Sequence, residues 1–285
     1  MAVKIKFLGI AQDAGIPQIG CNCKVCSKIY RGERKEEYPV ALGIINEKTG
    51  KKFMIEATPA FSKQYKKLID IEKGEKLEGI ILTHAHIGHY TGLMMLGREV
   101  LNTKRLKVFV SSKMGEFLKN NAPWNQLVKL DNIEIIEFKN RVPFVLDDGI
   151  EVTPIEVVHR NEYADTYGFL VKGEEKIFFV PDIDRWNGFE EDLNKLINEC
   201  KKVIVDATFY TKEEIGKVRG RDLNEIPHPT IEETIKYVED NKLPSEKIVF
   251  THFNHTNMVL SNEDIRKNVE EKGFVISQED MEILI

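Results

Sequence analysis

The sequence predicts an α/β fold, because short strand-like runs alternate along the chain with segments of helical spacing. Two further observations agree with this prediction. The 285 residues suffice for one large α/β domain, and a chain of this length buries most of its apolar surface without disulfides. A hydrophobic content of 42% and a charged content of 31% are typical of a globular protein and exclude a disordered chain.

The predicted strands are short runs of β-branched, aliphatic and aromatic residues bounded by turn-forming or charged residues. Val3–Leu8 opens the chain and leads into a strand-poor segment, residues 10–38. Ala41–Asn46 and Lys52–Ile55 are expected to form a hairpin. The later strands are expected at Gly79–Thr83, Val108–Ser111, Ile133–Phe138, Ile150–Val158, Tyr167–Val171, Lys176–Val180, Lys202–Asp206, Lys247–Thr251 and near Ile285.

The predicted helices are segments in which apolar residues recur three and four positions apart. They are expected at Phe61–Ile71, Thr91–Leu101, Lys113–Asn120, Phe189–Cys200, Ile231–Asn241 and Asn262–Glu271. No linker, low-complexity tract or block of like charges divides the sequence. Residues 1–285 are therefore expected to form a single domain that includes a cysteine-rich loop, residues 9–38.

Charge and hydropathy limit the partners of the chain. The net charge of −5 argues against nucleic acid, since phosphate binding needs a basic face. No apolar run approaches the roughly 18 residues of a membrane span, and the first residues lack the apolar segment of a signal peptide. We expect a cytoplasmic protein with reduced cysteines and a small-molecule substrate, without a nucleic-acid or membrane partner. A homodimer is left open.

Three histidines, His84, His86 and His89, directly follow the predicted strand Gly79–Thr83. Residues two apart in an extended chain point to one side, so His84 and His86 are expected to act together. His89 lies near the start of the next helix and approaches from another direction. Imidazole binds zinc, iron and related metals. The segment therefore predicts a metal site, and the alternative is a polar loop with incidental histidines.

Three more candidate ligands end apolar runs in the second half of the chain. His159 and His252 each follow a run of strand-forming residues, as His84 does. Either one by itself is also explained as a packed or surface histidine. Asp182 follows Lys176–Val180 and is either a ligand or the cap of a following helix.

The segment His84-x-His86-x-Gly88-His89 resembles the HxHxDH motif of the metallo-β-lactamase fold. Glycine stands at position 88, where the family has aspartate. The later motifs of that family have counterparts here in the same order: His159, Asp182 and His252. The resemblance covers nearly the whole chain and implies a four-layer αββα sandwich.

The resemblance also implies two adjacent metal positions. Position one would take His84, His86 and His159, and position two would take His89 and His252, with Asp182 bridging the two. Glu56 stands where the fold often has a structural aspartate, and Asp184 is expected to cap a helix or support a ligand. Because the carboxylate missing at Gly88 belongs to position two, we expect position one to be filled and position two to be weak. Zinc, manganese and iron are the candidate metals.

Cys21, Cys23 and Cys26 form a C-x-C-x-x-C cluster, which in a reducing compartment indicates a metal site. A redox pair or a chance run of thiols is the alternative. A tetrahedral zinc needs a fourth ligand, and the residues themselves leave Cys200, His228 and His255 as candidates. A closed Cys₃His site would be structural, because it has no open position.

Residues 9–26 resemble the N-terminal loop of two related groups, the coenzyme PQQ synthesis protein B group and the PhnP group of cyclic-phosphate phosphodiesterases. In the PhnP group, three such cysteines and a distant histidine hold a structural zinc. The resemblance implies that His228 is this histidine. The second interpretation of His228 is an active-site histidine, as in the ribonuclease Z branch of the fold. Cys200 is expected to be a small buried apolar residue.

Three segments, Asp182–Trp186, Asp206–Tyr210 and Thr251–Asn257, favour the PQQ synthesis protein B group. Phe209 stands where the PhnP group carries a histidine, which argues against a cyclic phosphodiesterase. Three residues of these segments could act on substrate near the metals or form local hydrogen bonds in loops: His255, Tyr210 and Asn257.

The resemblance implies a metal-dependent hydrolase of a small ester or phosphodiester, with Asp182 and His255 as catalytic residues. A metal with an open position lowers the pKa of bound water to about 7 and so makes a nucleophile. One alternative is an oxidoreductase or hydroxylase in PQQ-type cofactor biosynthesis, which would need a redox-active metal such as iron. The other is a non-catalytic metal-binding protein, because Gly88 replaces the motif aspartate.

Overall fold

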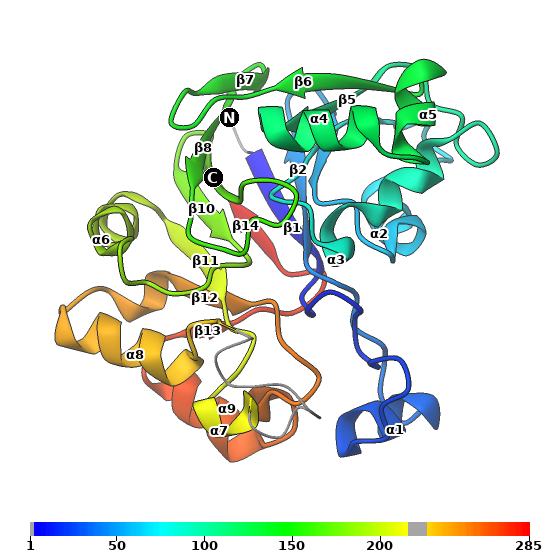
Figure 1. Cartoon of the computed structure of the whole chain (residues 1–285). Coiled ribbons are helices and arrows are strands. Elements are labelled where there is room, and N and C mark those ends of the chain that lie inside the picture. The colour runs from blue at the N-terminus through cyan, green and yellow to red at the C-terminus, as the bar shows by residue number, and fades with distance from the viewer. Residues whose placement is uncertain (1–2, 216–226) are drawn as a thin grey trace.

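Two seven-stranded sheets lie face to face, with helices on their outer sides (Figure 1). The computed structural model describes residues 3–215 and 227–285. Its layers confirm the αββα sandwich that the motifs imply. No helix in these two ranges is long and apolar enough to cross a membrane.

The first sheet has the order β14-β1-β2-β3-β4-β5-β6. It is antiparallel from β14 to β3 and parallel from β3 to β6. Its strands are β1 (Val3–Gly9), β2 (Ala41–Asn46), β3 (Lys52–Ile55), β4 (Leu77–Ile81), β5 (Leu106–Val110), β6 (Ile133–Glu137) and β14 (Glu282–Leu284).

The second sheet has the order β13-β12-β11-β10-β9-β8-β7 and the same division. It is antiparallel from β7 to β10 and parallel from β10 to β13. Its strands are β7 (Phe144–Asp147), β8 (Ile150–Glu156), β9 (Tyr167–Lys172), β10 (Lys176–Val180), β11 (Lys202–Asp206), β12 (Ile248–Thr251) and β13 (Val275–Ile276).

The helices divide between the sheets in chain order. Those of the first half are α1 (Lys24–Tyr30), α2 (Phe61–Leu68), α3 (Ile87–Tyr90), the 3₁₀ helix η1 (Thr91–Leu96), α4 (Ser112–Asn120) and α5 (Trp124–Lys129). Those of the second half are α6 (Glu190–Glu199), α7 (Lys212–Ile215), α8 (Ile231–Asp240), η3 (Ser245–Lys247), η4 (Met258–Leu260) and α9 (Glu263–Glu271). Helices α2, α4 and α5 contact the first sheet, and α6 and α9 contact the second.

The side chains of the first sheet alternate between two cores, as the period of a strand requires. In β1, Ile5 and Phe7 join the core between the sheets, whereas Leu8 joins the core under the helices of the first half. In β4, Ile81 faces the inner core and Ile80 the outer one. The first sheet is thus apolar on both faces, which is why its strands are near-continuous apolar runs.

The structure adds elements to the predicted ones. Helix α1 lies within the segment 10–38 and stands apart from the sheets in Figure 1. Strand β7 was not predicted, and its Asp147 is buried by contacts with Thr49 and Lys51 from the β2–β3 hairpin. The predicted helix over 91–101 is a short 3₁₀ helix, η1, and its Gly92 packs so closely that a Cβ there would lie 2.3 Å from the carbonyl oxygen of Thr58.

Parallel strands bring their carboxyl ends to one edge of each sheet. In the second sheet, β10 ends two residues before Asp182, β11 ends at Asp206, and β12 ends directly before His252. In the first sheet, β4 ends shortly before His84. The polar residues that follow these strands therefore meet at one end of the sandwich.

Candidate metal centre

The structure brings the expected ligands of position one together around Asp182. His84 and His86 follow β4, and His159 follows β8. One ligand atom from each histidine and one from Asp182 lie within 4.8 Å of one another. Asp182 Oδ2 is 3.4 Å from His84 Nε2, 3.3 Å from His159 Nε2 and 4.0 Å from His86 Nδ1. This is the grouping that the motif order predicts.

The expected ligands of position two lie beside the first group. His89 Nε2 is 3.9 Å from Asp182 Oδ2, and the rings of His89 and His252 are 5.5 Å apart between centroids. His89 and His252 also form a compact group with Asp13. Nothing in the local sequence pattern around Asp13 distinguishes it from an ordinary turn residue, so it was not among the predicted ligands.

Each of the five histidines has one ring nitrogen held by an oxygen atom. The partners are Thr83 Oγ1 for His84 Nδ1 at 2.7 Å, Glu162 Oε2 for His86 Nε2 at 3.0 Å, Glu56 Oε1 for His89 Nδ1 at 3.2 Å, Asp184 Oδ1 for His159 Nδ1 at 2.7 Å and Thr208 Oγ1 for His252 Nδ1 at 3.0 Å. Such contacts fix the orientation of a metal-binding histidine. The expected supporting roles of Glu56 and Asp184 agree with these contacts.

Several polar atoms that face the centre are buried without a hydrogen-bond partner among the described residues. They are His84 Nε2, His89 Nε2, His252 Nε2, Asp182 Oδ1 and Asp13 Oδ1. Buried polar atoms are nearly always paired, so orphaned nitrogen and carboxylate atoms in one place need a partner of another kind. Imidazole and carboxylate groups are the donors that zinc, manganese and iron bind. The residues therefore fit a metal centre.

Charge within the centre is shared between carboxylates and imidazoles. Burial alone would raise the pKa of Asp182, but His159 and His228 hold it well below its ordinary value. Burial would lower the pKa of His159 and of His89, but Asp182 raises the first to about 10 and Glu56 with Asp13 raises the second to about 10. Burial dominates at His84 and lowers its pKa well below the ordinary value.

Backbone strain also gathers here. Glu56 and His252 have φ angles of 80° and 64°, in the left-handed region that side chains other than glycine seldom adopt. Such conformations cost about 1–3 kcal/mol each and persist where the surrounding structure holds them. Their location at the metal centre indicates that the fold accepts strain in order to place these side chains.

His228 does not lie with the cysteines, so the predicted Cys₃His228 site is wrong. Its Nδ1 atom is 2.7 Å from Asp206 Oδ2 and 3.4 Å from Asp182 Oδ1. The physical reason is that β11 delivers the buried Asp206 beneath the segment that leads into α8. The second interpretation, an active-site histidine, agrees with this position. Asp206 is a further buried carboxylate of the centre that the sequence analysis did not single out as functional.

The cysteines instead lie beside His255, whose Nδ1 atom is 3.5 Å from both Cys21 Sγ and Cys23 Sγ. Cys26 completes the group. His255, which is predicted to be catalytic, therefore lies with the cysteines and is not among the grouped ligands of the histidine centre. The N–H of Phe253 donates to the carbonyl oxygen of Ile10, and the N–H of Gln12 donates to that of Phe253, so the two loops are held together, and His255 lies two residues farther along. This pairing of distant segments is the reason that His255, and not His228, lies beside the cysteines.

The pKa values of two thiols and the imidazole of this cluster are shifted from their ordinary values. Burial raises the pKa of Cys26 to about 12. Burial also acts to raise the pKa of Cys23, but hydrogen bonds from the Cys26 backbone N–H and from the Cys21 and Cys26 side chains together lower that pKa. Burial lowers the pKa of His255, which keeps its imidazole neutral and able to bind a metal. A neutral imidazole with three thiols is the donor set of a structural zinc site.

The other candidates have local roles. Asn257 is buried, donates to the carbonyl oxygen of Ala207 at 2.7 Å and caps η4, which matches the interpretation as a hydrogen-bonded loop residue. Tyr210 is half-buried and packs against the core, and its backbone N–H donates to Glu214 Oε2 at 3.1 Å. Cys200 is buried, and its expected role as a small apolar residue is confirmed.

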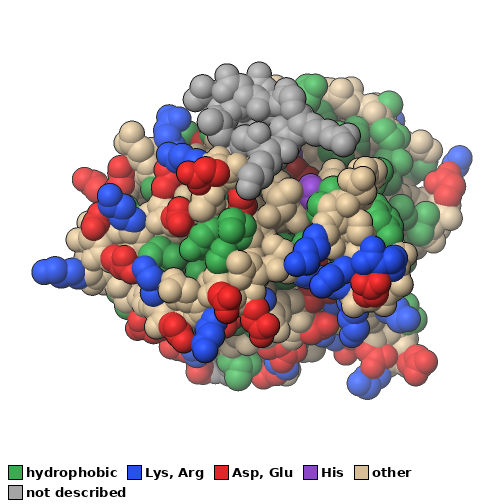
Figure 2. Space-filling model, turned by 90° about the horizontal axis from the view of Figure 1, so that it is seen from below, with side chains coloured by type: hydrophobic (Ala, Val, Ile, Leu, Met, Phe, Trp, Pro, Cys, Tyr) green, Lys and Arg blue, Asp and Glu red, His purple; other side chains and the backbone are tan. Residues whose placement is uncertain are grey.

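Access to the centre lies on the side of His86. Its side chain is 19% exposed, whereas those of His84, His89, His159 and His252 are 1% exposed or less. Figure 2 shows a small purple patch of histidine in a hollow of one face of the molecule. A small molecule would therefore meet the ligands at the edge of the sandwich.

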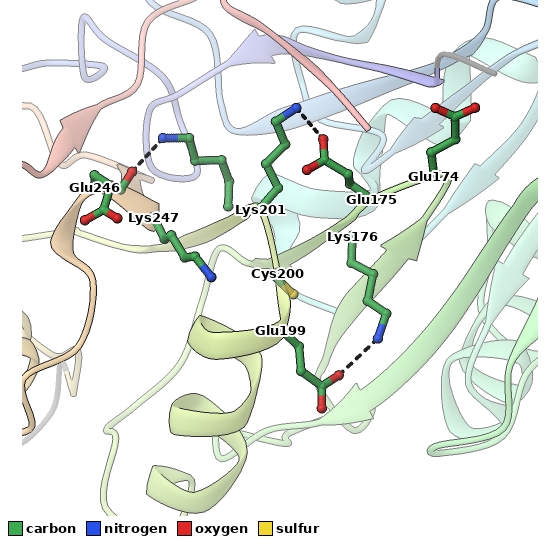
Figure 3. A pocket seen from close by; sticks show the side chains of 9 residues that line it. Glu174, Glu175, Lys176, Glu199, Cys200, Lys201, Glu246 and Lys247 are labelled. Atoms are coloured by element: carbon green, nitrogen blue, oxygen red, sulfur yellow. Dashed lines mark hydrogen bonds and ion pairs between the residues drawn. The ribbon is translucent and has the colours of Figure 1, made fainter.

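A second depression, shown in Figure 3, lies at the opposite ends of the same strands. Its lining includes the first residues of β10 and β11, Lys176 and Lys202, together with Cys200. Its charged side chains pair with one another: Lys176 contacts Glu199 at 3.0 Å, and Lys201 contacts Glu175. These pairs make the depression an ordinary charged surface rather than a second site.

Comparison with known proteins defines the class that the fold and the histidine centre indicate. The family model of the beta-lactamase superfamily domain matches residues 51–253, and the chain belongs to this family. The matched range includes β4, β10, β11 and β12, which carry the candidate ligands at their carboxyl ends.

Within this class, the chain is similar to coenzyme PQQ synthesis protein B. The protein of that name from Nitrosococcus oceani is 24% identical over 99% of both chains. Zn²⁺-bound PqqB from Methylobacterium extorquens has the same fold, with a TM-score of 0.83 and 18% identity over 98% of this chain and 99% of that one. A diphosphatase of the PhnP family has a TM-score of 0.66 and 20% identity over 100% and 98% of the chains.

Proposed function

We propose that this protein is a metal-dependent hydrolase of a small ester or phosphodiester. One observation carries the proposal: five histidines and Asp182 meet at the carboxyl ends of strands, with buried donor atoms that lack partners among the described residues. A packed core would not leave such atoms unpaired. The fold of a PhnP-family diphosphatase supports a phosphoester substrate.

The ligand sets follow from the geometry. His84, His86, His159 and Asp182 would hold one metal ion, and His89 and His252 would take part in holding a second beside it. Zinc, manganese and iron match these donors. When bound, a metal ion with an open position supplies Lewis acidity and lowers the pKa of water to about 7.

The chain supplies orientation and proton transfer. Asp184 and Glu56 hold the rings of His159 and His89 in place. Asp182, whose pKa lies well below its ordinary value, stays ionised and can accept a hydrogen bond from the attacking water. Burial would lower the pKa of His228, but Asp206 and Asp182 raise it. His228, held at Nδ1 by Asp206, is therefore the candidate to donate a proton to the leaving group.

The test uses the full chain, stripped with a chelator and reloaded with zinc, manganese or iron. Bis(4-nitrophenyl) phosphate, lactones and thioesters are the probe substrates. Turnover is expected only with metal and is expected to be lost in Asp182→Asn. Asp70→Asn, at an exposed residue paired with Lys73, is the matched control and should retain turnover. Metal-loaded protein that hydrolyses no probe would contradict the proposal and favour a non-catalytic metal-binding protein.

A second candidate is an oxidoreductase or hydroxylase in the biosynthesis of a quinone cofactor. The observation that favours it is the match to coenzyme PQQ synthesis protein B over nearly the whole length of both chains. The histidine and carboxylate donors accept iron as readily as zinc. Oxygen consumption by the iron-loaded protein with a quinone-precursor substrate, absent when zinc is bound, would support this candidate over hydrolysis.

A further inference from the structure

The space beside Gly88 is filled by a residue from a distant part of the chain. A Cβ built on Gly88 would lie 2.4 Å from both Cα and Oδ1 of Asp13, and 2.9 Å from its Cβ. Real Cβ atoms do not approach other heavy atoms so closely, so a side chain at 88 and Asp13 in its present place exclude each other. The carboxylate of Asp13 thus occupies the place in which a residue-88 side chain would begin.

The carboxylate of Asp13 faces the histidines of position two. Its Oδ1 atom is 3.4 Å from His89 Nε2, and Asp13, His89 and His252 form a group within 4.8 Å. The Asp13 side chain as a whole is 48% exposed. Its Oδ1 atom is nevertheless buried and, like the Nε2 atoms of both histidines, has no hydrogen-bond partner within residues 3–215 and 227–285. Three unpaired donor atoms that converge in this way indicate a shared ligand.

The backbone holds Asp13 in this place. The N–H of Gln12 donates to the carbonyl oxygen of Phe253 at 2.9 Å, and the N–H of Phe253 donates to that of Ile10 at 2.9 Å. These bonds pair Ala11 with Phe253 in parallel and hold the segment that carries Asp13 beside the segment that carries His252. Asp13 has a positive φ of 21°, and aspartate is among the residues that tolerate positive φ best. The position is therefore built into the fold and does not depend on a freely moving side chain.

We propose that Asp13 is the carboxylate ligand of the second metal position and takes the place of the motif aspartate that is absent at Gly88. The second position was expected to bind metal weakly because residue 88 supplies no carboxylate. With Asp13, the donor set consists of His89, His252, Asp13 and the shared Asp182. The inference rests on the metal centre of the proposed function, but it does not depend on which reaction that centre performs.

The test measures zinc bound per chain by mass spectrometry after dialysis against chelator-buffered zinc. Asp13→Asn should bind one zinc fewer than the native chain at a free zinc concentration that fills the native sites. Its Kd for that zinc should rise by more than about 100-fold, because even changes behind the ligands cost about 10–100-fold. Gly88→Ala, which adds no donor but collides with Asp13, should lose the same zinc.

Gln12→Ala is the control, since it alters the same loop without changing its backbone bonds or a donor atom, and it should bind as the native chain does. Unchanged zinc binding in Asp13→Asn would overturn the proposal. So would a native chain that binds a single zinc at its histidines, which anomalous diffraction at the zinc edge would reveal. Zinc binding that depends on Asp13 without any turnover would remove the proposed hydrolase and leave this inference intact.

Discussion

The two nitrogens of each histidine ring in the centre are in different surroundings. One nitrogen contacts an oxygen of Thr83, Glu162, Glu56, Asp184 or Thr208, and the other faces Asp182 or a neighbouring ligand. The sequence predicts the histidines themselves because each follows an apolar strand. It does not predict most of their supporting oxygens, which come from segments far away in the chain.

At Asp184, we expect the supporting contact to control metal affinity. Asp184→Ala removes the oxygen that lies 2.7 Å from His159 Nδ1 and should weaken metal binding at position one by roughly 10–100-fold. Isothermal titration with zinc measures the change. Asp192→Ala, which removes a carboxylate paired with Arg141 away from the centre, should leave the affinity unchanged. Equal affinities for the two variants would show that Asp184 does not support His159.

Metal binding should release protons. The pKa values of His89 and His159 are raised to about 10, so both imidazoles carry an extra proton at pH 7.5 in the metal-free protein. A metal must displace these protons, about two in total, and its affinity should fall as the pH is lowered. Titration calorimetry in two buffers of different ionisation enthalpy counts the protons. Release of none would contradict the raised pKa values.

The raised pKa values of His89 and His159 also determine how the stability of the metal-free fold changes with pH. A histidine whose folded pKa is raised above the ordinary value near 6.5 stabilises the metal-free fold fully below that pH. This contribution is lost as the pH rises toward 10. Metal binding removes the dependence, because the displaced protons are then absent in the folded state.

At the scale of elements, the candidate ligands lie just after the ends of strands and not within the strands. The bounds of β2, β3, β10 and β11 coincide with the predicted ones, since apolar runs with polar ends define a strand locally. Strand β7, with four residues, and helix α1, with seven, were not predicted, because segments this short show too little of a period to identify them. The histidine ligands could be predicted for the same reason as the strands, whereas Asp13, in a loop, could not.

The loop that carries Asp13 also carries the cysteine cluster. His255 lies three residues after His252, so a zinc at Cys21, Cys23, Cys26 and His255 would hold together the two segments that carry Asp13 and His252. Cys23→Ser should therefore lower the melting temperature and remove one bound zinc, with a smaller effect on metal at the histidines. Scanning calorimetry and metal analysis measure both effects.

Cys200→Ala is the control for the cysteine cluster, because it removes a buried thiol that lies outside the cluster. Its zinc content should equal that of the native chain. A Cys23→Ser variant with native zinc content and native melting temperature would count against a structural zinc at this place.

At the scale of the whole molecule, aromatic side chains join the two sheets. Phe138, which follows β6 of the first sheet, packs edge-on against Phe169 of β9 in the second, with centroids 5.5 Å apart. Phe109 of β5 stacks on Phe144 of β7 at 5.0 Å. These contacts hold the strand ends of the two sheets in a fixed relation, and the metal centre draws ligands from both.

Phe169→Ala should lower the free energy of unfolding by about 3–5 kcal/mol, since it leaves a cavity between the sheets. Urea unfolding followed by circular dichroism measures the change. Phe117→Ala, on the outer helix α4 and half-buried, should cost less. If both substitutions cost the same, the core between the sheets would not have the central role assigned to it here.

The sequence by itself determined the α/β class, most strands, and the histidine and cysteine ligands, because these depend on local hydrophobic period and on close spacing in the chain. The motif resemblance added the αββα layers. Only the tertiary structure decided that His255, not His228, lies with the cysteines, and that Asp13 lies where position 88 has no side chain. Both results depend on how loops from distant segments pair, and local pattern does not encode the distance between such segments.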